Sequence, residues 1–171
     1  MAKAPAVRDF VPSAGRRIAG ILLVMDCDGT ILEHLSRDEC LRLMSSVPVG
    51  RIVFTRQALP AVEVVNFTVD RGDIVFRTDA GGKLTAAVSD AVVAFEADSM
   101  DFTRHAGWSV TVVGQCRTIT DSEEVCRLER FALRPWAPGE RKHFIKITPV
   151  IVNGRRLVTG RQEAQGNAHR L

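Results

Sequence analysis

Apolar and polar residues alternate most clearly in the middle of this chain, between residues 60 and 69. One face of that segment would carry Ala61, Glu63, Val65, Phe67 and Val69, and the other Val62, Val64, Asn66 and Thr68. Alternation of this kind is typical of a β-strand with one side buried. A β-branched run at residues 50–56 precedes it, and the reversal D-R-G-D at residues 70–73 leads into an apolar run at residues 74–78. The pattern predicts three consecutive antiparallel strands.

The rest of the pattern predicts more strands and a few short helices. Extended segments are expected at residues 91–97, 108–118, 142–148 and 150–158, the last interrupted at residues 153–154. Short helices are expected at residues 36–46, 84–89 and 121–131. Capping boxes open the first and last helix at residues 36–39 and 120–123, and the polar residues 98–107 are expected to form a loop. Six or seven strands at hairpin spacing indicate a mainly β protein whose sheet closes into an antiparallel barrel.

Length and composition fit one folded domain with two loose ends. The chain has 171 residues, of which 46% are apolar, which is enough for the core of a single domain. We expect residues 35–158 to form that domain. Residues 1–34 are expected to be a partly mobile N-terminal extension, and residues 159–171 a polar C-terminal tail.

Charge and cysteine content argue against several classes of function. The chain has 23 basic and 20 acidic residues, a balance too even to indicate nucleic-acid binding. Its four cysteines show no C-x-x-C spacing, so we expect reduced thiols and no metal site. The apolar run at residues 18–25 is far shorter than the ~20 residues of a membrane-crossing helix. These observations predict a cytoplasmic protein that binds neither nucleic acid nor membrane.

A candidate anion site follows the third predicted strand. Arg77 and Thr78 end that strand, and Lys83 follows after the glycine pair at residues 81–82. Glycine lets a ligand approach the backbone amides, and the two cations can donate charge-assisted hydrogen bonds to a phosphate. Either cation alone is typical of an ordinary surface residue, but together with the glycines they favour a phosphate site.

Several segments, taken in order, resemble one known family. They are V-G-R-I-V-F-T-R at residues 49–56, V-V-N-F at 64–67, R-T at 77–78, G-G-K-L at 81–84, A-F-E at 94–96, G-W-S-V at 107–110, L-R-P-W-A-P-G at 133–139 and G-R-R at 154–156. This series resembles the pyridoxamine-phosphate-oxidase-like proteins, the flavin-binding split β-barrels, in their small actinobacterial form. The resemblance covers residues 35–157. It implies a Greek-key split barrel of six to seven antiparallel strands that forms a homodimer.

The same resemblance implies a cofactor and the residues that bind it. The cofactor would be FMN or, alternatively, the deazaflavin coenzyme F-420, held at the subunit interface, with haem as a further alternative. Arg77 and Lys83 would hold its phosphate, and Asn66 and Trp108 would lie near its ring system. The implied cofactor-binding residues are Val65, Asn66, Phe67, Phe76, Arg77, Thr78, Lys83, Leu84, Trp108 and Ser109. The family usually has P-V-N-Y at residues 64–67, whereas this chain has V-V-N-F and so lacks one hydroxyl.

Two of these residues also have purely structural interpretations. Asn66 sits in an apolar strand, where an unpaired amide is costly, so it would bond either a flavin ring or a neighbouring strand or turn. Trp108 offers a flat face for stacking on a ring, and a position in the core is the alternative.

The chain shows no grouping of nucleophile and base that would indicate covalent catalysis, so we expect no dedicated catalytic side chain. That fits a redox protein, in which the cofactor supplies the electron chemistry. We therefore expect an FMN- or deazaflavin-dependent oxidoreductase that transfers hydride to or from a small conjugated substrate. The alternative is a non-catalytic protein that binds flavin or haem on the same barrel.

A third hypothesis comes from residues 21–31, an apolar run followed by D-C-D-G-T. This segment resembles the first motif of haloacid-dehalogenase-type phosphatases, in which Asp26 would be the nucleophile, Asp28 the general acid/base, and both would hold magnesium. Such an enzyme needs a parallel sheet with helical crossovers. The hairpins predicted after residue 49 argue against it.

Overall fold

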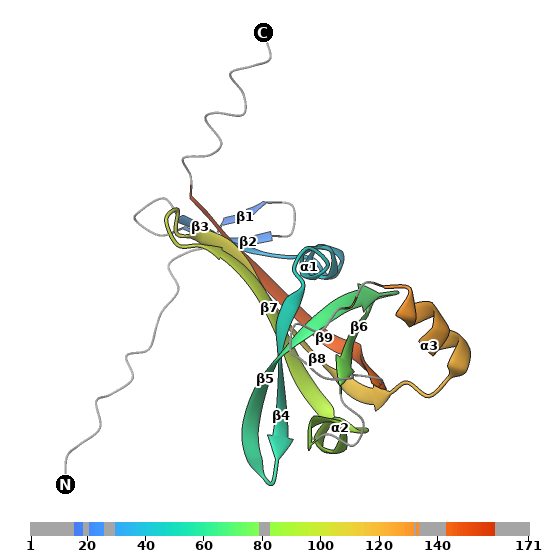
Figure 1. Ribbon diagram of the computed structural model, residues 1–171. Helices are drawn as coiled ribbons and strands as arrows, with labels where there is room; N and C mark the ends of the chain where they lie inside the picture. Colours follow the sequence, from blue (N-terminus) through green and yellow to red (C-terminus); the bar gives the residue numbers. More distant parts are fainter. Residues whose placement is uncertain are drawn as a thin grey trace, which may run out of the picture.

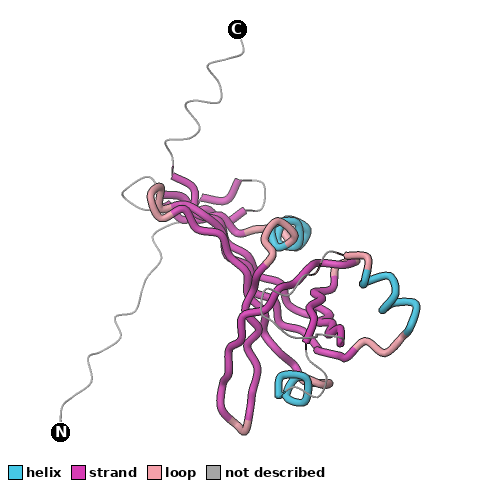
Figure 2. Tube along the Cα trace, in the orientation of Figure 1, coloured by secondary structure: helices cyan, strands magenta, loops and turns pink. Residues whose placement is uncertain are grey.

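The computed structural model of the chain describes residues 16–18, 21–25, 30–78, 83–131, 133 and 143–159. Within these residues the chain forms nine strands and three helices (Figures 1 and 2). The strands are β1 (Arg16–Ile18), β2 (Ile21–Met25), β3 (Thr30–His34), β4 (Val49–Arg56), β5 (Leu59–Asp70), β6 (Asp73–Thr78), β7 (Val92–Asp101), β8 (Ala106–Thr118) and β9 (His143–Thr159). The helices are α1 (Arg37–Met44), α2 (Lys83–Val88) and α3 (Ser122–Glu129). None of these three helices is long and apolar enough to span a membrane.

Six of the strands close into a ring. They lie in the order β9, β6, β5, β4, β7 and β8, and β8 pairs with β9 to complete the circuit. Every described strand pair is antiparallel. The structure therefore confirms a mainly β fold with short helices and a closed antiparallel barrel. Strands β1 to β3 extend the sheet beyond β9.

Strand β9 connects the barrel to the N-terminal strands. Its first residues pair with β6, and residues 155–159 pair with β3. Its other edge pairs with β8. The interruption expected at residues 153–154 is wrong, because Gly154 stays in register with Val110 of β8. Glycine is required there for another reason, since a Cβ would collide with the Sγ of Cys40 on α1.

The loop expected at residues 98–107 is wrong, because this segment is a hairpin. Strands β7 and β8 stay paired as far as Asp101 and Ala106. The Asp101 carboxylate accepts hydrogen bonds from the main-chain N–H groups of Thr103 and Arg104, both at 3.0 Å, and so holds the turn. The segment is polar because residues 99–105 are exposed, not because the pairing stops.

The barrel interior confirms the alternation in β5. Val65 and Phe67 are buried, and the Phe67 ring meets the Phe95 ring edge-on with the centroids 4.8 Å apart. On the other face of β5, Val62 and Val64 are 59% and 67% exposed. One face of this strand therefore belongs to the core, and the other faces outward.

Helix α3 lies at the outside of the barrel (Figure 1). Its residue Leu128 belongs to a second, smaller apolar cluster. The members of this α3 cluster are Val75, Ile119, Leu128, Leu133 and Phe144. The helix is capped by Asp121, whose carboxylate accepts from the main-chain N–H of Glu124 at 2.8 Å. The cap predicted at Thr120 is therefore one residue too early, because the Asp121 carboxylate occupies the capping position.

We expect Asp121→Ala to lower the free energy of unfolding by about 1 kcal/mol, the usual result of losing an N-cap. Thr120→Ala is the matched control and should change it by less than about 0.5 kcal/mol, as for an ordinary surface substitution. Urea unfolding of both variants measures the difference. A larger loss for Thr120→Ala than for Asp121→Ala would contradict the cap assignment.

Candidate functional site

Four of the predicted cofactor-binding residues have their side chains in the core. Val65, Phe67 and Phe76 are 4%, 4% and 0% exposed, and Leu84 of α2 is 7% exposed. Their side chains are used in packing, so only their main-chain atoms are available to a ligand outside the barrel. The alternation in β5 could have shown this for Val65 and Phe67, which lie on its apolar face.

Asn66 and Arg77 lie on the outer face of the same two strands. Phe67 pairs with Phe76 on the inside, so the residues next to them, Asn66 and Arg77, both face outward. The Asn66 Nδ2 donates to the main-chain oxygen of Pro48 at 3.3 Å, a contact with the bend before β4. The fold thus places an amide and a cation on one outer surface, at the end of β6 where the sequence predicted an anion site.

One donor of the Arg77 guanidinium has no partner. The Cζ of Arg77 lies over the Phe144 ring, 4.9 Å from its centroid. Within the described residues, the buried Nε of Arg77 makes no hydrogen bond. A buried donor without an acceptor is unfavourable, and a bound anion would satisfy it. This orphaned donor is the feature of the site that most directly indicates an anionic ligand.

The end of β6 is tied to the start of α2. The Thr78 side chain is 5% exposed, and its Oγ1 accepts from the Thr85 Oγ1 at 3.5 Å. Gly81 and Gly82 lie outside the described residues, and for Lys83 only the main chain is described, as the first residue of α2. A strand-to-helix connection therefore links Arg77 and Lys83, and a phosphate contact by the Lys83 side chain stays a prediction.

Trp108 and Ser109 lie on a different part of the sheet. On β8, Trp108 is on the same face as the buried Val110 and packs against the core, which matches the structural interpretation of this residue. Ser109 faces the other way, in register with Asp98 and Arg155. The described chain does not bring Trp108 onto the outer surface that holds Arg77.

An apolar row on the outside of the barrel was not predicted from the sequence. In register across β5, β4, β7, β8 and β9 lie Val62, Val53, Ala94, Val113 and Ile151. We call these five residues the outer apolar row. Next to it, Val64 and Val92 are 67% and 73% exposed. One feature of the sequence did indicate this row, because the outward face of β5 carries two valines, Val62 and Val64. Exposed apolar areas of this kind mark contacts with other molecules.

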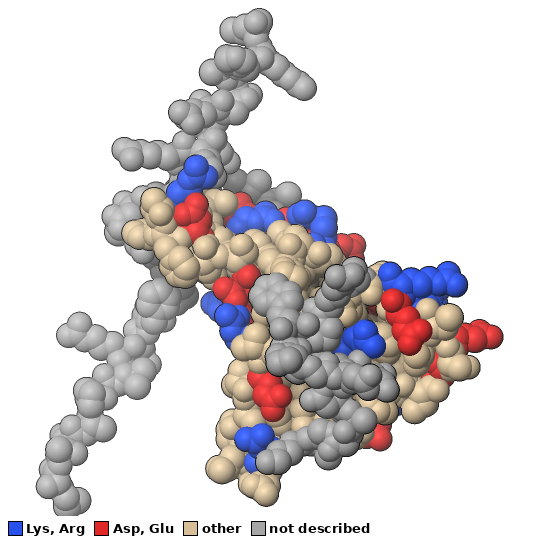
Figure 3. Space-filling model, in the orientation of Figure 1, with Lys and Arg blue, Asp and Glu red and all other residues tan. Residues whose placement is uncertain are grey.

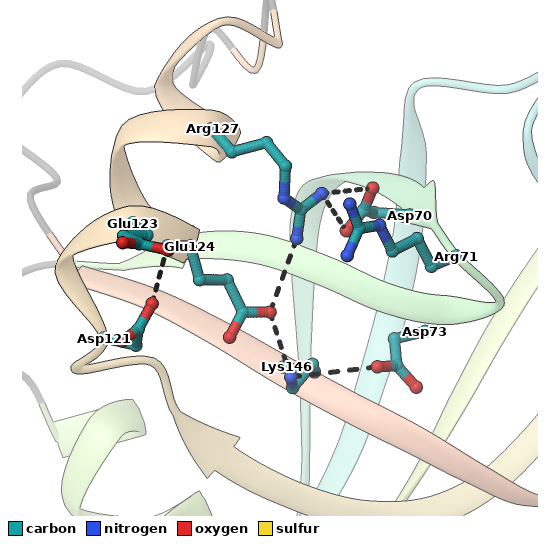
Figure 4. Close-up of a pocket in the computed structure, with 8 residues that line it drawn as sticks. All are labelled: Asp70, Arg71, Asp73, Asp121, Glu123, Glu124, Arg127 and Lys146. Atoms are coloured by element: carbon teal, nitrogen blue, oxygen red, sulfur yellow. Dashed lines mark hydrogen bonds and ion pairs between the residues drawn. The ribbon is translucent and has the colours of Figure 1, made fainter.

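A cavity of about 560 Å³ lies between α3 and the β5–β6 turn (Figure 4). It is lined by charged residues: Asp70, Arg71, Asp73, Asp121, Glu123, Glu124, Arg127 and Lys146. Arg127 donates to both oxygens of Asp70 at 2.7 and 2.6 Å, and this contact raises the pKa of Arg127. Glu124 accepts from Lys146 at 3.0 Å. These pairs attach α3 to the barrel, so their charges are already compensated within the chain.

Charge on the molecule is mixed. Figure 3 shows basic and acidic side chains in small neighbouring groups on the face that it draws. Among the described residues, Arg51 forms ion pairs with Glu96 and Asp98, at 2.8 and 2.5 Å. The described residues on this face form no basic stripe of the kind that nucleic-acid binding requires.

The two buried thiols do not form a reactive site. Cys40 and Cys116 are buried, and burial raises the pKa of Cys40 and raises that of Cys116 to about 12. Both therefore stay protonated at neutral pH and are poor nucleophiles. In the described part of the chain, no group of three or more His, Cys, Asp or Glu side chains could hold a metal ion.

The phosphatase hypothesis does not fit the fold. Asp26 and Asp28 lie outside the described residues. The strands around them are antiparallel, whereas the hypothesis requires a parallel sheet.

Comparison with known proteins agrees with this barrel. A family model described as pyridoxamine 5'-phosphate oxidase matches residues 36–156. The uncharacterized protein Rv0080 of Mycobacterium tuberculosis is 45% identical over 130 residues, which are 73% of this chain and 85% of that protein. The structure of the FAD binding protein from Mycobacterium smegmatis is similar with a TM-score of 0.63 and 35% identity, covering 72% of this chain and 96% of that one. A conserved protein of unknown function from Corynebacterium diphtheriae gives a TM-score of 0.62 and 30% identity, covering 74% and 98%.

Proposed function

Because the chain belongs to the pyridoxamine 5'-phosphate oxidase family, we propose that it binds a flavin, with FMN as the first candidate, and holds the flavin phosphate at Arg77 and Lys83. The observation that carries the proposal is the buried Arg77 Nε without an acceptor. A phosphate oxygen is the kind of acceptor that a guanidinium prefers. The FAD binding protein from Mycobacterium smegmatis, 35% identical, supports a flavin as the bound group.

The bound flavin would supply hydride transfer with a small conjugated substrate, and the chain would bind and orient it. Arg77 and Lys83 would hold the tail. Asn66 lies on the same outer face as Arg77 and would direct its amide toward the ring system. Ser109 and the main chain of Val65 and Phe67 are further candidate contacts.

We expect the cofactor to lie where two copies of the chain meet. On β5, Val64 lies between Val62 of the outer apolar row and Asn66, and all three residues are on the same face. The exposed apolar surface therefore borders the candidate site. A second copy that covers this row would remove exposed valines from water and enclose the flavin.

We expect Val64→Glu to weaken the dimer about tenfold or more, because the interface would have to bury a carboxylate. Cys126→Glu is the matched control, since Cys126 is exposed on α3, which contributes neither to the outer apolar row nor to the surface around Val64. Light scattering after size exclusion measures the oligomeric state over a dilution series. A wild-type protein that is monomeric throughout would contradict the proposed interface.

The absorption and mass spectra of the cofactor released from the native protein test the main proposal. Release of FMN or FAD would support the proposal. Release of coenzyme F-420 or haem would instead identify one of the two alternative cofactors. A colourless protein that also fails to quench the fluorescence of added FMN would contradict it. Stopped-flow reduction by NADPH or by reduced deazaflavin, with turnover of an acceptor, separates an oxidoreductase from a non-catalytic flavin binder.

A further inference from the structure

The Phe144 side chain is shared between the α3 cluster and Arg77. It is 1% exposed and belongs to the α3 cluster, together with Val75 and Leu128. Its main-chain oxygen accepts from the N–H of Ile119 at 2.9 Å. Arg77 is its direct register partner on β6, and the guanidinium Cζ lies 4.9 Å from the ring centroid.

Helix α3 is held against this cluster from the outside. The Nη1 of Arg127 donates to both carboxylate oxygens of Asp70 and so ties the helix to the end of β5, and Glu124 ties it to Lys146 of β9 (Figure 4). Leu128, the next residue after Arg127, is fully buried in the same cluster as Phe144. The ring therefore has little freedom to move, because the helix above it is attached at two places.

An aromatic ring positions a cation differently from a carboxylate. A carboxylate would accept the N–H groups of Arg77 and neutralise its charge, as Asp70 does for Arg127. A ring attracts the guanidinium through its face and leaves the N–H groups available for another acceptor. The Arg77 Nε, buried and without an acceptor in the described chain, shows this state.

We propose that Phe144 is a positioning residue, which holds the Arg77 guanidinium ready for the phosphorylated tail of the cofactor. This inference rests on the proposed flavin binding. It predicts that Phe144 contributes to binding of the phosphate and not to binding of the ring system.

The test compares FMN with riboflavin, which has the same ring system and no phosphate. Dissociation constants of both ligands for the cofactor-free full-length protein are measured by quenching of flavin fluorescence. In Phe144→Leu we expect the preference for FMN over riboflavin to fall about fivefold, with riboflavin binding unchanged. Phe144→Met, whose unbranched and flexible side chain fills irregular core space, should behave in the same way and keeps the test informative if the leucine variant folds poorly.

Two controls separate positioning from a general loss of stability. Phe95→Leu removes another fully buried phenylalanine, in the barrel core, and should leave the preference for FMN unchanged. In an Arg77→Met background, Phe144→Leu should cause no further loss of the preference.

Three results would overturn the inference. The first is a wild-type preference for FMN that survives in both Phe144 variants, and the second is an equal loss of FMN and riboflavin binding. The third is a wild-type protein that binds neither flavin, which would overturn the proposed function as well.

Discussion

Arg77→Met is expected to lower the affinity for FMN by roughly 10- to 100-fold and to leave the affinity for riboflavin unchanged. A charge-assisted hydrogen bond from a guanidinium contributes about 1.5–3 kcal/mol, which corresponds to this range. Methionine retains an unbranched chain that can still pack on the Phe144 ring, so the substitution removes mainly the charge and the donors. Titration of both flavins into the cofactor-free protein measures the two affinities.

The control for this prediction is Arg117→Met, which makes the same change in net charge at an exposed position on β8. It should leave the preference for FMN over riboflavin as in the wild type. The assignment of Arg77 to the phosphate would be wrong if Arg77→Met weakened both flavins equally, or if the two arginine variants behaved alike.

Gly114→Ala is expected to lower the free energy of unfolding by about 3 kcal/mol, at the upper end of what overpacking usually causes. Gly114 lies where β8 meets a bulge of β9, and a Cβ there would collide with the main-chain oxygen of Thr148. Because the obstacle is the backbone of a paired strand, it cannot turn aside as a side chain would. For a domain of this size the loss corresponds to a fall in Tm of roughly 6–12 °C, measured by calorimetry or circular dichroism.

Gly72→Ala is the comparison that separates collision from backbone strain. Gly72 has φ +89° and nothing within 4 Å of the position that a Cβ would take. Its replacement should therefore show only the conformational effect, about 1 kcal/mol. If Gly72→Ala lowered the free energy of unfolding as much as Gly114→Ala does, close packing between β8 and β9 would not explain why residue 114 is a glycine.

Local patterns in the sequence were sufficient to predict strands β4 to β9 in outline and one of the two predicted helix caps. The alternation in β5 identified Val65 and Phe67 as core residues, because strand geometry alone assigns neighbouring residues to opposite faces. Ser36 was predicted as the cap of α1, and its Oγ accepts from the N–H of Glu39 at 3.3 Å. The cap of α3 was misplaced because Thr120 and Asp121 are both good caps, and only the backbone conformation selects between them.

The candidate site could be predicted only in part. Its position after β6 followed from the order of Arg77, Thr78 and Lys83 along the chain. The predicted set also contained Phe76, whose side chain is in the core, because a family motif names neighbours along the strand without separating its two faces. Phe144 could not be predicted, since it lies 67 residues after Arg77 and becomes its partner only through the pairing of β6 with β9.

Sequence patterns alone were enough to locate the central parts of β4 to β9, the β5–β6 turn and the apolar face of β5, because these properties depend on residues close together in the chain. The tertiary structure alone decided that β8 closes onto β9, that five strands contribute one apolar row to the outer surface, and that the Phe144 ring lies beside the Arg77 guanidinium. Those features depend on the register between distant strands. That register is set when the whole barrel packs its interior, since a shift by one residue would exchange the two faces of a strand.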